Sequence, residues 1–207
     1  MRDGADGFET DYWTTHDARI VSHHDATLDR MTDGSGSIGG RTWTYVRGVR
    51  NSSGAPVPTL RGVERRMASY GGRRQQEIKD GAAFSRAMLE QVLRIDRAHG
   101  RLAGRVLITS SQLPTLRRVH ALAPRVGIGL IDRTTTGRPR LSRVPGWVDV
   151  LAIDLRAADA KYVARARAAG HAVSVRNVDT VLQLHAAVAL GVRRVVTNMP
   201  EVLGRSC

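Results

Sequence analysis

With 207 residues, 42% of them hydrophobic, the chain is long enough for one domain with a sizeable core, and no apolar run reaches the ~18–20 residues of a membrane-spanning helix. The single cysteine, Cys207, excludes an internal disulfide framework, and residues 1–7 lack the apolar stretch of a signal peptide. The net charge of +13 would suit a nucleic acid, but we predict no nucleic-acid partner, because the basic residues, nearly all arginine, are scattered and only 4% of residues are aromatic.

The first predicted strand, residues 7–13, carries two carboxylates on one face. Glu9 and Asp11 are two positions apart, so their side chains point to the same side of a strand. Two like charges at this separation are unfavourable unless a cation lies between them, and a hard divalent cation such as Mg²⁺ or Ca²⁺ is the simplest candidate. On spacing alone, such a pair is more often a solvated face than a metal site.

A second extended piece, residues 19–24, leads into the tripeptide His23-His24-Asp25. An imidazole beside a carboxylate-bound metal suits acid–base chemistry on a phosphate or an ester. The chain then continues with a regularly spaced series, Leu28, Arg30, Thr32, Gly34 and Gly36.

The whole run 7–36 resembles the glycerophosphodiester phosphodiesterase (GDPD) family. Its members carry a Glu-x-Asp metal pair, a His-Asp dipeptide and a Leu-x-Arg-x-Thr-x-Gly-x-Gly run, and this chain has all three. The resemblance implies an α/β fold, a TIM (β/α)8 barrel of the PLC-like phosphodiesterase type. It also implies that Glu9 and Asp11 bind the metal and that His24 is a catalytic acid–base residue. Asp25 would shape the turn or orient His24, and His23 would be a bystander.

Residues 33–58 are rich in Gly, Ser, Arg and Pro, and their large apolar anchors are Trp43 and Tyr45. A loop of this length inside a compact domain usually serves as a lid or a binding loop. We therefore predict an active-site loop insertion at about 33–58 within a single domain of residues 1–207. Pro58-Thr59-Leu60 then begins a helix to about residue 70, as it does in the family before the next barrel strand.

The next predicted strand, residues 73–80, adds a third carboxylate in the tripeptide Glu77-Ile78-Lys79. Glu77 and Lys79 share one face, and the sites of barrel enzymes lie at the carboxyl ends of their strands. We therefore expect Glu9, Asp11 and Glu77 to converge on Mg²⁺ or Ca²⁺. Lys79 matches the lysine of the family's Glu-x-Lys strand, which implies a catalytic role in holding a phosphate oxygen. The alternative is a surface lysine.

The remainder of the chain alternates helices with strands. Helices are predicted at 82–99, 114–122, 157–169 and 178–190, and strands at 106–109, 126–131, 149–155, 171–175 and 194–197. This alternation predicts a parallel sheet with right-handed crossovers. The glycines at 127 and 129 suggest a place where a neighbouring segment packs closely.

The prediction contains seven main strands, whereas a (β/α)8 barrel has eight. Family members begin with a strand ending in His-Arg-Gly and a first helix, and this chain has no His-Arg-Gly, so we expect a barrel truncated at its N-terminus. Thr197-Asn198-Met199-Pro200 matches the usual family ending. Val173-Ser174-Val175 aligns with the family's Trp-Thr-Val but lacks the tryptophan, which weakens the expected grip on glycerol.

The resemblance implies metal-assisted hydrolysis of a small-molecule glycerophosphodiester to glycerol 3-phosphate and an alcohol, within lipid and glycerol metabolism. The glycerol 2-hydroxyl would be the internal nucleophile, with His24 as one of two proton carriers. Because the His-Arg-Gly histidine has no counterpart here, a second hypothesis is a catalytically inactive barrel that binds phosphorylated ligands or a partner protein. A third, a nucleic-acid binder, rests on net charge alone. Mg²⁺ and Ca²⁺ both remain open, as do the alcohol, the oligomeric state and the compartment.

Overall fold

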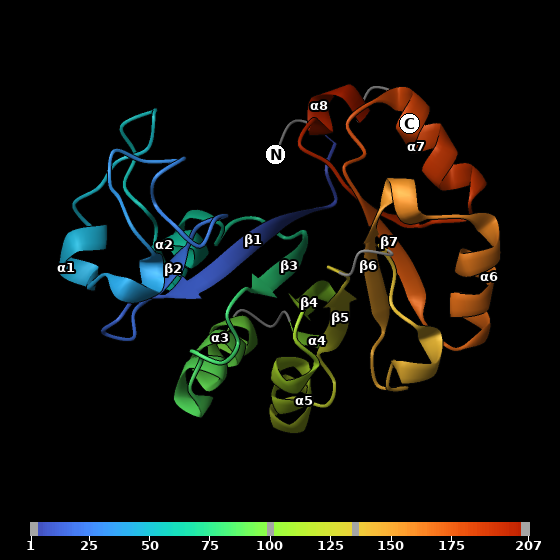
Figure 1. The fold of residues 1–207 in the computed structure, drawn as a ribbon, viewed down its shortest axis with the longest axis horizontal. Helices are drawn as coiled ribbons and strands as arrows, with labels where there is room; N and C mark the ends of the chain where they lie inside the picture. The colour runs from blue at the N-terminus through green and yellow to red at the C-terminus, as the bar shows by residue number, and fades with distance from the viewer. Residues whose placement is uncertain (1–3, 99–101, 134–136, 204–207) are drawn as a thin grey trace.

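The computed structural model describes residues 4–98, 102–133 and 137–203, and its centre is one curled sheet of eight strands (Figure 1). The strands are β1 (Gly7–Thr14), β2 (Ile20–Ser22), β3 (Arg73–Ile78), β4 (Val106–Ser110), β5 (Gly127–Ile131), β6 (Val150–Asp154), β7 (Ala172–Arg176) and β8 (Arg194–Val196). The helices are α1 (Trp43–Val46), α2 (Leu60–Arg66), α3 (Arg86–Ala98), α4 (Leu102–Arg105), α5 (Leu113–Leu122), α6 (Ala160–Ala168), α7 (Val181–Ala189) and α8 (Pro200–Leu203).

The strands follow the order β2-β1-β3-β4-β5-β6-β7-β8, and all neighbours are parallel except the antiparallel pair of β2 and β1. The seven parallel strands are the seven that the sequence predicts, shifted by at most one residue at either end except for β3, which ends two residues before the predicted strand does. The eighth is the short β2, which pairs with the end of β1 and forms one edge of the sheet. The fold is therefore of the predicted barrel type, in the form of an open, curled half-barrel.

Three helices begin two or three residues later than the sequence pattern predicts, because a side chain caps each one. Thr59 accepts a hydrogen bond from the backbone of residue 62 at the start of α2, and Asp159 does the same for Tyr162 in α6. In α7, Thr180 and Gln183 form a reciprocal capping box. Within the described ranges, no helix is both long and apolar enough to cross a membrane.

The two faces of the sheet differ in polarity because alternate residues of a strand point to opposite sides. The convex face is apolar, and α3, α5 and α6 lie along it (Figure 1). The concave face carries Glu9, Asp11 and Glu77 at the ends of β1 and β3, and the pairing register places Asp11 opposite Glu77. The core on the convex face includes Tyr12, Ile78, Ile108, Ile128, Leu151 and Val175.

The strands β4 and β5 approach closely at the glycines that the sequence singles out. A Cβ atom on Gly129 would lie 2.7 Å from Cγ2 of Thr109, and one on Gly127 would lie 3.0 Å from the carbonyl oxygen of Val106. Neither position has room for a side chain unless the neighbouring strand moves. The predicted close packing is therefore confirmed.

Residues 15–58 form a lobe beside the end of β1 that has a small core of its own (Figure 1). Trp43 packs against this core, as does Trp13 from β1, but aliphatic side chains fill most of it. Of the two large anchors predicted for this segment, Trp43 packs against the core and Tyr45 is exposed. The buried members of the core are Val21, Leu28, Ile38, Val46, Val49 and Val57.

A buried ion pair, absent from the sequence-based expectations, ties β3 to the helices on the convex face. Arg74 of β3 is fully buried and bonds to Glu64 of α2, which is also buried. Asp96 of α3 lies 3.9 Å from the same guanidinium nitrogen and 3.4 Å from the amide nitrogen of Gln76. These contacts hold the convex side of β3 in place, while Glu77 and Lys79 point to the concave side.

Candidate functional site

Three carboxylates converge on the concave face at the ends of β1 and β3. Glu9, Asp11 and Glu77 each place one carboxylate oxygen within 4.8 Å of the others. Asp11 and Glu77 are only 7% and 6% exposed, so the alternative of a solvated acidic face does not describe them. The predicted convergence of these three residues is present in the structure.

Glu9 shows what such crowding does to a carboxyl group. Burial, and after it the negative charge and hydrogen bond of Asp11, raises the pKa of Glu9 to about 9. At neutral pH the side chain therefore holds a proton, which takes the place of a positive charge between the carboxylates. An all-oxygen donor set that keeps a proton in this way fits a hard divalent cation such as Mg²⁺ or Ca²⁺.

Lys79 lies inside this cluster and not at the surface. Its ammonium nitrogen is 3.0 Å from Oδ1 of Asp11 and 2.8 Å from Oε2 of Glu77, and its side chain is only 6% exposed. The surface-lysine alternative is therefore wrong. An amino group between two carboxylates at the strand ends is well placed to meet an anionic ligand.

Arg133 also contacts the cluster, and the sequence analysis missed it. Its Nη2 donates a hydrogen bond of 2.9 Å to Oε1 of Glu77, although Arg133 lies two residues beyond the end of β5. The side chain spans the end of β4 to reach Glu77. Its place directly after a strand was a usable signal, because the carboxyl ends of parallel strands share one edge of the sheet.

His24 is oriented by a carboxylate that is itself held by an arginine. Nδ1 of His24 lies 2.6 Å from Oδ1 of Asp25, and Arg30 donates two hydrogen bonds to the same carboxylate. The bonds from Arg30, and then that from His24, hold the pKa of Asp25 well below its usual range. Because an ionised carboxylate only accepts, Nδ1 of His24 is the donor, and Nε2 is left to exchange a proton.

His23 has a structural place, as predicted for a bystander. Its side chain is 9% exposed, and its Nε2 donates to the carbonyl oxygen of Thr27 at 3.1 Å. Its backbone nitrogen donates to the carbonyl oxygen of Asp11 at 3.1 Å. That bond joins the turn that carries His24 directly to the strand that carries two of the three carboxylates.

The spaced series after His24 builds the support for this turn. Leu28 is fully buried in the core of the lobe, and Arg30 holds Asp25. Thr32 donates to the carbonyl oxygen of Leu28 at 2.8 Å, and Gly36 has a φ of +87°, which favours glycine. These positions support the turn that carries His24, and Arg30 does so through its bonds to Asp25.

Two later stretches also resemble the family, residues 197–200 and 173–175. The first has hydrogen-bond partners in the structure and the second is buried. Asp179 accepts hydrogen bonds from the backbone nitrogen of Asn198 at 2.7 Å and from Oγ1 of Thr197 at 3.2 Å, which anchors the end of β8. Val173, where the family tryptophan is expected, is buried in the core on the convex face, and Ser174 is buried on the concave face. No aromatic ring stands in this stretch.

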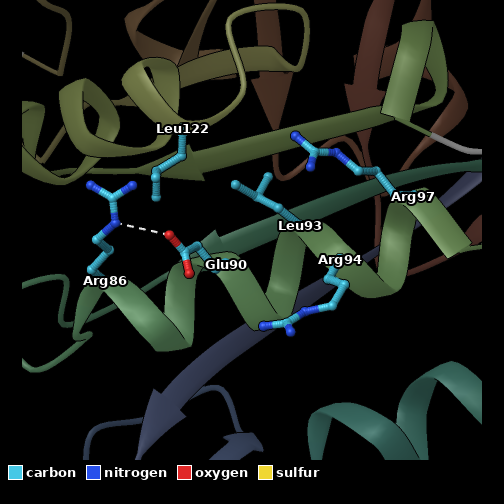
Figure 2. Close-up of a pocket in the computed structure, with 6 residues that line it drawn as sticks. All are labelled: Arg86, Glu90, Leu93, Arg94, Arg97 and Leu122. Atoms are coloured by element: carbon cyan, nitrogen blue, oxygen red, sulfur yellow. Dashed lines mark hydrogen bonds and ion pairs between the residues drawn. The ribbon is translucent and has the colours of Figure 1, made fainter.

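A separate hollow of about 300 Å³ lies between α3 and α5 (Figure 2). Leu93 and Leu122 face each other across it, Arg86 pairs with Glu90 at 2.8 Å at one end, and Arg94 points away (Figure 2). Because Leu93 belongs to the core on the convex face, the hollow is on the opposite side of the sheet from the carboxylates. It is not part of the candidate site.

Comparisons with a family model and with a named relative indicate the same family. The model of the glycerophosphoryl diester phosphodiesterase family matches residues 1–202. A protein named glycerophosphodiester phosphodiesterase from Caldanaerobacter subterraneus subsp. tengcongensis is 30% identical over 138 residues, which are 63% of this chain. The matched region spans 56% of that relative's length.

Three solved structures share the fold. A phosphodiesterase from Oleispira antarctica in complex with the product sn-glycerol-3-phosphate has a TM-score of 0.86 and 21% identity, over 99% of this chain and 85% of that one. A glycerophosphodiester phosphodiesterase from Parabacteroides distasonis has a TM-score of 0.81 and 19% identity, over 99% and 84%. One from Agrobacterium tumefaciens has a TM-score of 0.76 and 19% identity, over 98% and 88%. At these identities the likeness establishes the fold alone.

Proposed function

The chain belongs to the glycerophosphoryl diester phosphodiesterase family, and from this we propose that it hydrolyses glycerophosphodiesters to glycerol 3-phosphate and an alcohol with a divalent metal ion. The observation that carries the proposal is the convergence of Glu9, Asp11 and Glu77 at the strand ends, with Lys79 between two of them. The name of the Caldanaerobacter relative and the product bound in the Oleispira structure agree with this reaction class.

Glu9, Asp11 and Glu77 would hold the metal ion, and Glu9 would lose its proton on binding. When bound, a divalent ion supplies charge neutralisation for the phosphate and lowers the pKa of a coordinated hydroxyl. Lys79 would move from the carboxylates to a phosphate oxygen and add to that neutralisation.

His24 would carry protons through Nε2, since Nδ1 is committed to Asp25. In the proposed sequence the glycerol 2-hydroxyl attacks phosphorus and loses its proton, and the bond from phosphorus to the alcohol oxygen breaks. The alcohol takes up a proton and leaves a cyclic phosphate, which one water molecule then opens to glycerol 3-phosphate. His24 would serve one of these proton transfers, a role worth roughly 10²–10⁴ in rate for a well-placed acid or base.

The second candidate function is a catalytically inactive barrel that binds phosphorylated ligands. The described histidines outside residues 23–24 support it, because each is either exposed or held by a partner outside the carboxylate cluster. His120 stacks on Trp147 and His171 bonds to the carbonyl oxygen of Val148, while His16 and His185 are exposed. With one histidine at the site, binding without turnover is a distinct outcome.

The deciding experiment measures release of glycerol 3-phosphate from glycerophosphoethanolamine with Mg²⁺ or Ca²⁺. We expect metal-dependent release that H24N and the double variant E9Q/D11N both abolish. A protein that binds the diester with metal but releases no product, with H24N indistinguishable in binding, would support the inactive barrel. Release that persists unchanged in E9Q/D11N would refute the assigned metal site.

A further inference from the structure

Two arginines lie on the concave side of the sheet at the carboxyl ends of β5 and β7, beyond the carboxylates. We call this edge of the sheet, formed by the carboxyl ends of β4 to β7, the rim. Arg133 reaches Glu77, as described above, and Arg176 is the last residue of β7. The guanidinium of Arg176 lies 3.3 Å from the carbonyl oxygen of Asp132 and 3.5 Å from that of Ala152. Arg176 thus extends across β6 to the peptide that precedes Arg133, and the two cations occupy one stretch of the rim.

The charge of Arg176 is not neutralised by these contacts. Its two acceptors are neutral backbone carbonyls at the long limit of hydrogen bonding, and no carboxylate of the described residues forms an ion pair with it. The nearby carboxylate of Asp154 is already bonded to Arg156 at 2.9 Å and to Asn177 at 2.6 Å. A guanidinium in this state favours a planar anion, which it can hold by two parallel hydrogen bonds.

Glu77 does not neutralise Arg133 fully either, because the same carboxylate also bonds to Lys79. Lys79, Arg133 and Arg176 bring three basic side chains to this end of the sheet, and two carboxylates, Asp11 and Glu77, bond to Lys79 and Arg133. Arg176 bonds to neither of them and contacts neutral carbonyl oxygens. The rim has the charge to hold a second anionic group in addition to the phosphodiester.

The same rim has no aromatic side chain. Among the described residues, the ends of β4 to β7 and the positions that follow them, 110–112, 131–133, 154–158 and 176–179, contain neither Phe, Tyr nor Trp. Quaternary ammonium groups are typically bound over the faces of aromatic rings. A choline head group would meet two guanidinium groups here and no ring.

We propose that Arg133 and Arg176 form an anion subsite next to the carboxylate cluster. The glycerophosphodiesters that suit this chain then carry a carboxylate or a further phosphate on the alcohol, and not a quaternary ammonium. This inference rests on the proposed function for its substrate frame. The subsite itself rests on the two arginines and their partners.

Matched pairs of substrates test the subsite. Glycerophosphoserine and glycerophosphoethanolamine differ by one carboxylate, and glycerophosphoinositol 4-phosphate and glycerophosphoinositol differ by one phosphate. We expect kcat/KM to favour the anionic member of at least one pair by about tenfold or more, since a charge-assisted hydrogen bond contributes roughly 1.5–3 kcal/mol. The pair that shows the preference identifies the source of the anion.

R176Q should reduce that preference to about threefold or less while it changes kcat/KM little for the member of the pair that lacks the additional anionic group. R133Q should reduce it as well, together with a general loss because Arg133 also contacts Glu77. The matched control is R165Q, which removes the same charge from an exposed position of α6. A preference that R176Q and R165Q alter equally would overturn the subsite.

A second readout separates this inference from the proposed function. Phosphoserine should raise the Tm of the protein more than phosphoethanolamine, and R176Q should remove the difference. If no diester is hydrolysed but this difference depends on Arg176, the reaction is wrong and the subsite is right. If diesters are hydrolysed with neither a substrate preference nor a phosphoserine effect, the reaction stands and the subsite is refuted.

Discussion

Nζ of Lys79 lies 3.0 Å from Oδ1 of Asp11, so a cation already sits against the carboxylate cluster. The raised pKa of Glu9 means that its carboxyl group is protonated and neutral at neutral pH, which removes one negative charge from the same cluster. The amino group of Lys79 and the proton of Glu9 can both be displaced, since a lysine side chain can rotate and a carboxyl proton can leave. The cluster is therefore built so that a divalent ion replaces charge that is already present.

Metal binding should stabilise the protein through this cluster. A ligand at 100 times its Kd adds about 2.7 kcal/mol to the free energy of unfolding, and for a chain of this size each kcal/mol is roughly 2–4 °C in Tm. We expect Mg²⁺ or Ca²⁺ to raise Tm by several degrees in the wild type and to have no effect in E9A/D11A. E90Q, which alters an exposed carboxylate on α3, is the control and should keep the full shift. An undiminished shift in the double variant contradicts the assignment.

The pH dependence of stability should reveal the proton on Glu9. The folded pKa of about 9 lies above the ordinary value of 4.5 for a glutamate, so the native state holds more protons than the unfolded state between these values. Stability from this group is present in full below pH 4.5 and is lost as pH rises through 9. With a chelator present to remove metal ions, the Tm of E9Q should therefore rise relative to the Tm of the wild type as pH increases from 5 to 9. A constant difference between the two proteins over that range would show that Glu9 is ionised throughout.

His23 and His24 should respond to substitution in opposite ways. H24N should lower kcat by roughly 10²–10⁴ with little change in Tm, because the side chain is exposed and its role is proton transfer. H23N should lower Tm, because His23 is buried and bonds to Thr27, and should leave the pH profile of kcat unchanged. Thermal melts and pH–rate profiles of both variants check this. A large loss of kcat in H23N at full stability would mean that the two roles are reversed.

Much of this site could be predicted from the sequence because it depends on local periodicity. Glu9 and Asp11 share a face in any strand, and Glu77 joins them because parallel strands end at one edge. Arg133 and Arg74 escaped notice for the opposite reason. A long arginine side chain can reach a partner on another strand or helix. The position of Arg133 after β5 indicates the edge of the sheet but not the partner, Glu77. The core of the lobe was underestimated because its valines follow neither a strand nor a helix period.

The buried pair of Arg74 and Glu64 should make β3 sensitive to the loss of one partner. Removing one member of a buried ion pair typically costs about 3–5 kcal/mol, whereas replacing both with apolar residues is often neutral. R74M should therefore lower the free energy of unfolding by that amount, and R74M/E64L should recover part of it, because Asp96 still loses the guanidinium beside it. Urea unfolding measures both. If the double variant is as unstable as R74M, the pair is not the source of the effect.

The lobe formed by residues 15–58 is predicted to cover the site through its segment 33–58. It is attached where β2 pairs with the end of β1, next to the turn that holds His24, and its small core is separate from that of the sheet. A unit with a small core of its own opens at lower cost than the sheet, so trypsin should cut it first, after the exposed Arg47 or Arg50. Phosphate with Mg²⁺ should slow this cleavage if the lobe closes over the bound anion. Cleavage after Arg165 provides the control. Because α6 lies on the convex face, away from the carboxylates, the rate of this cleavage should not change with phosphate and Mg²⁺. Cutting of the lobe at the same rate with and without phosphate and Mg²⁺ would count against a covering role and would leave the lobe as a support for His24 and Asp25.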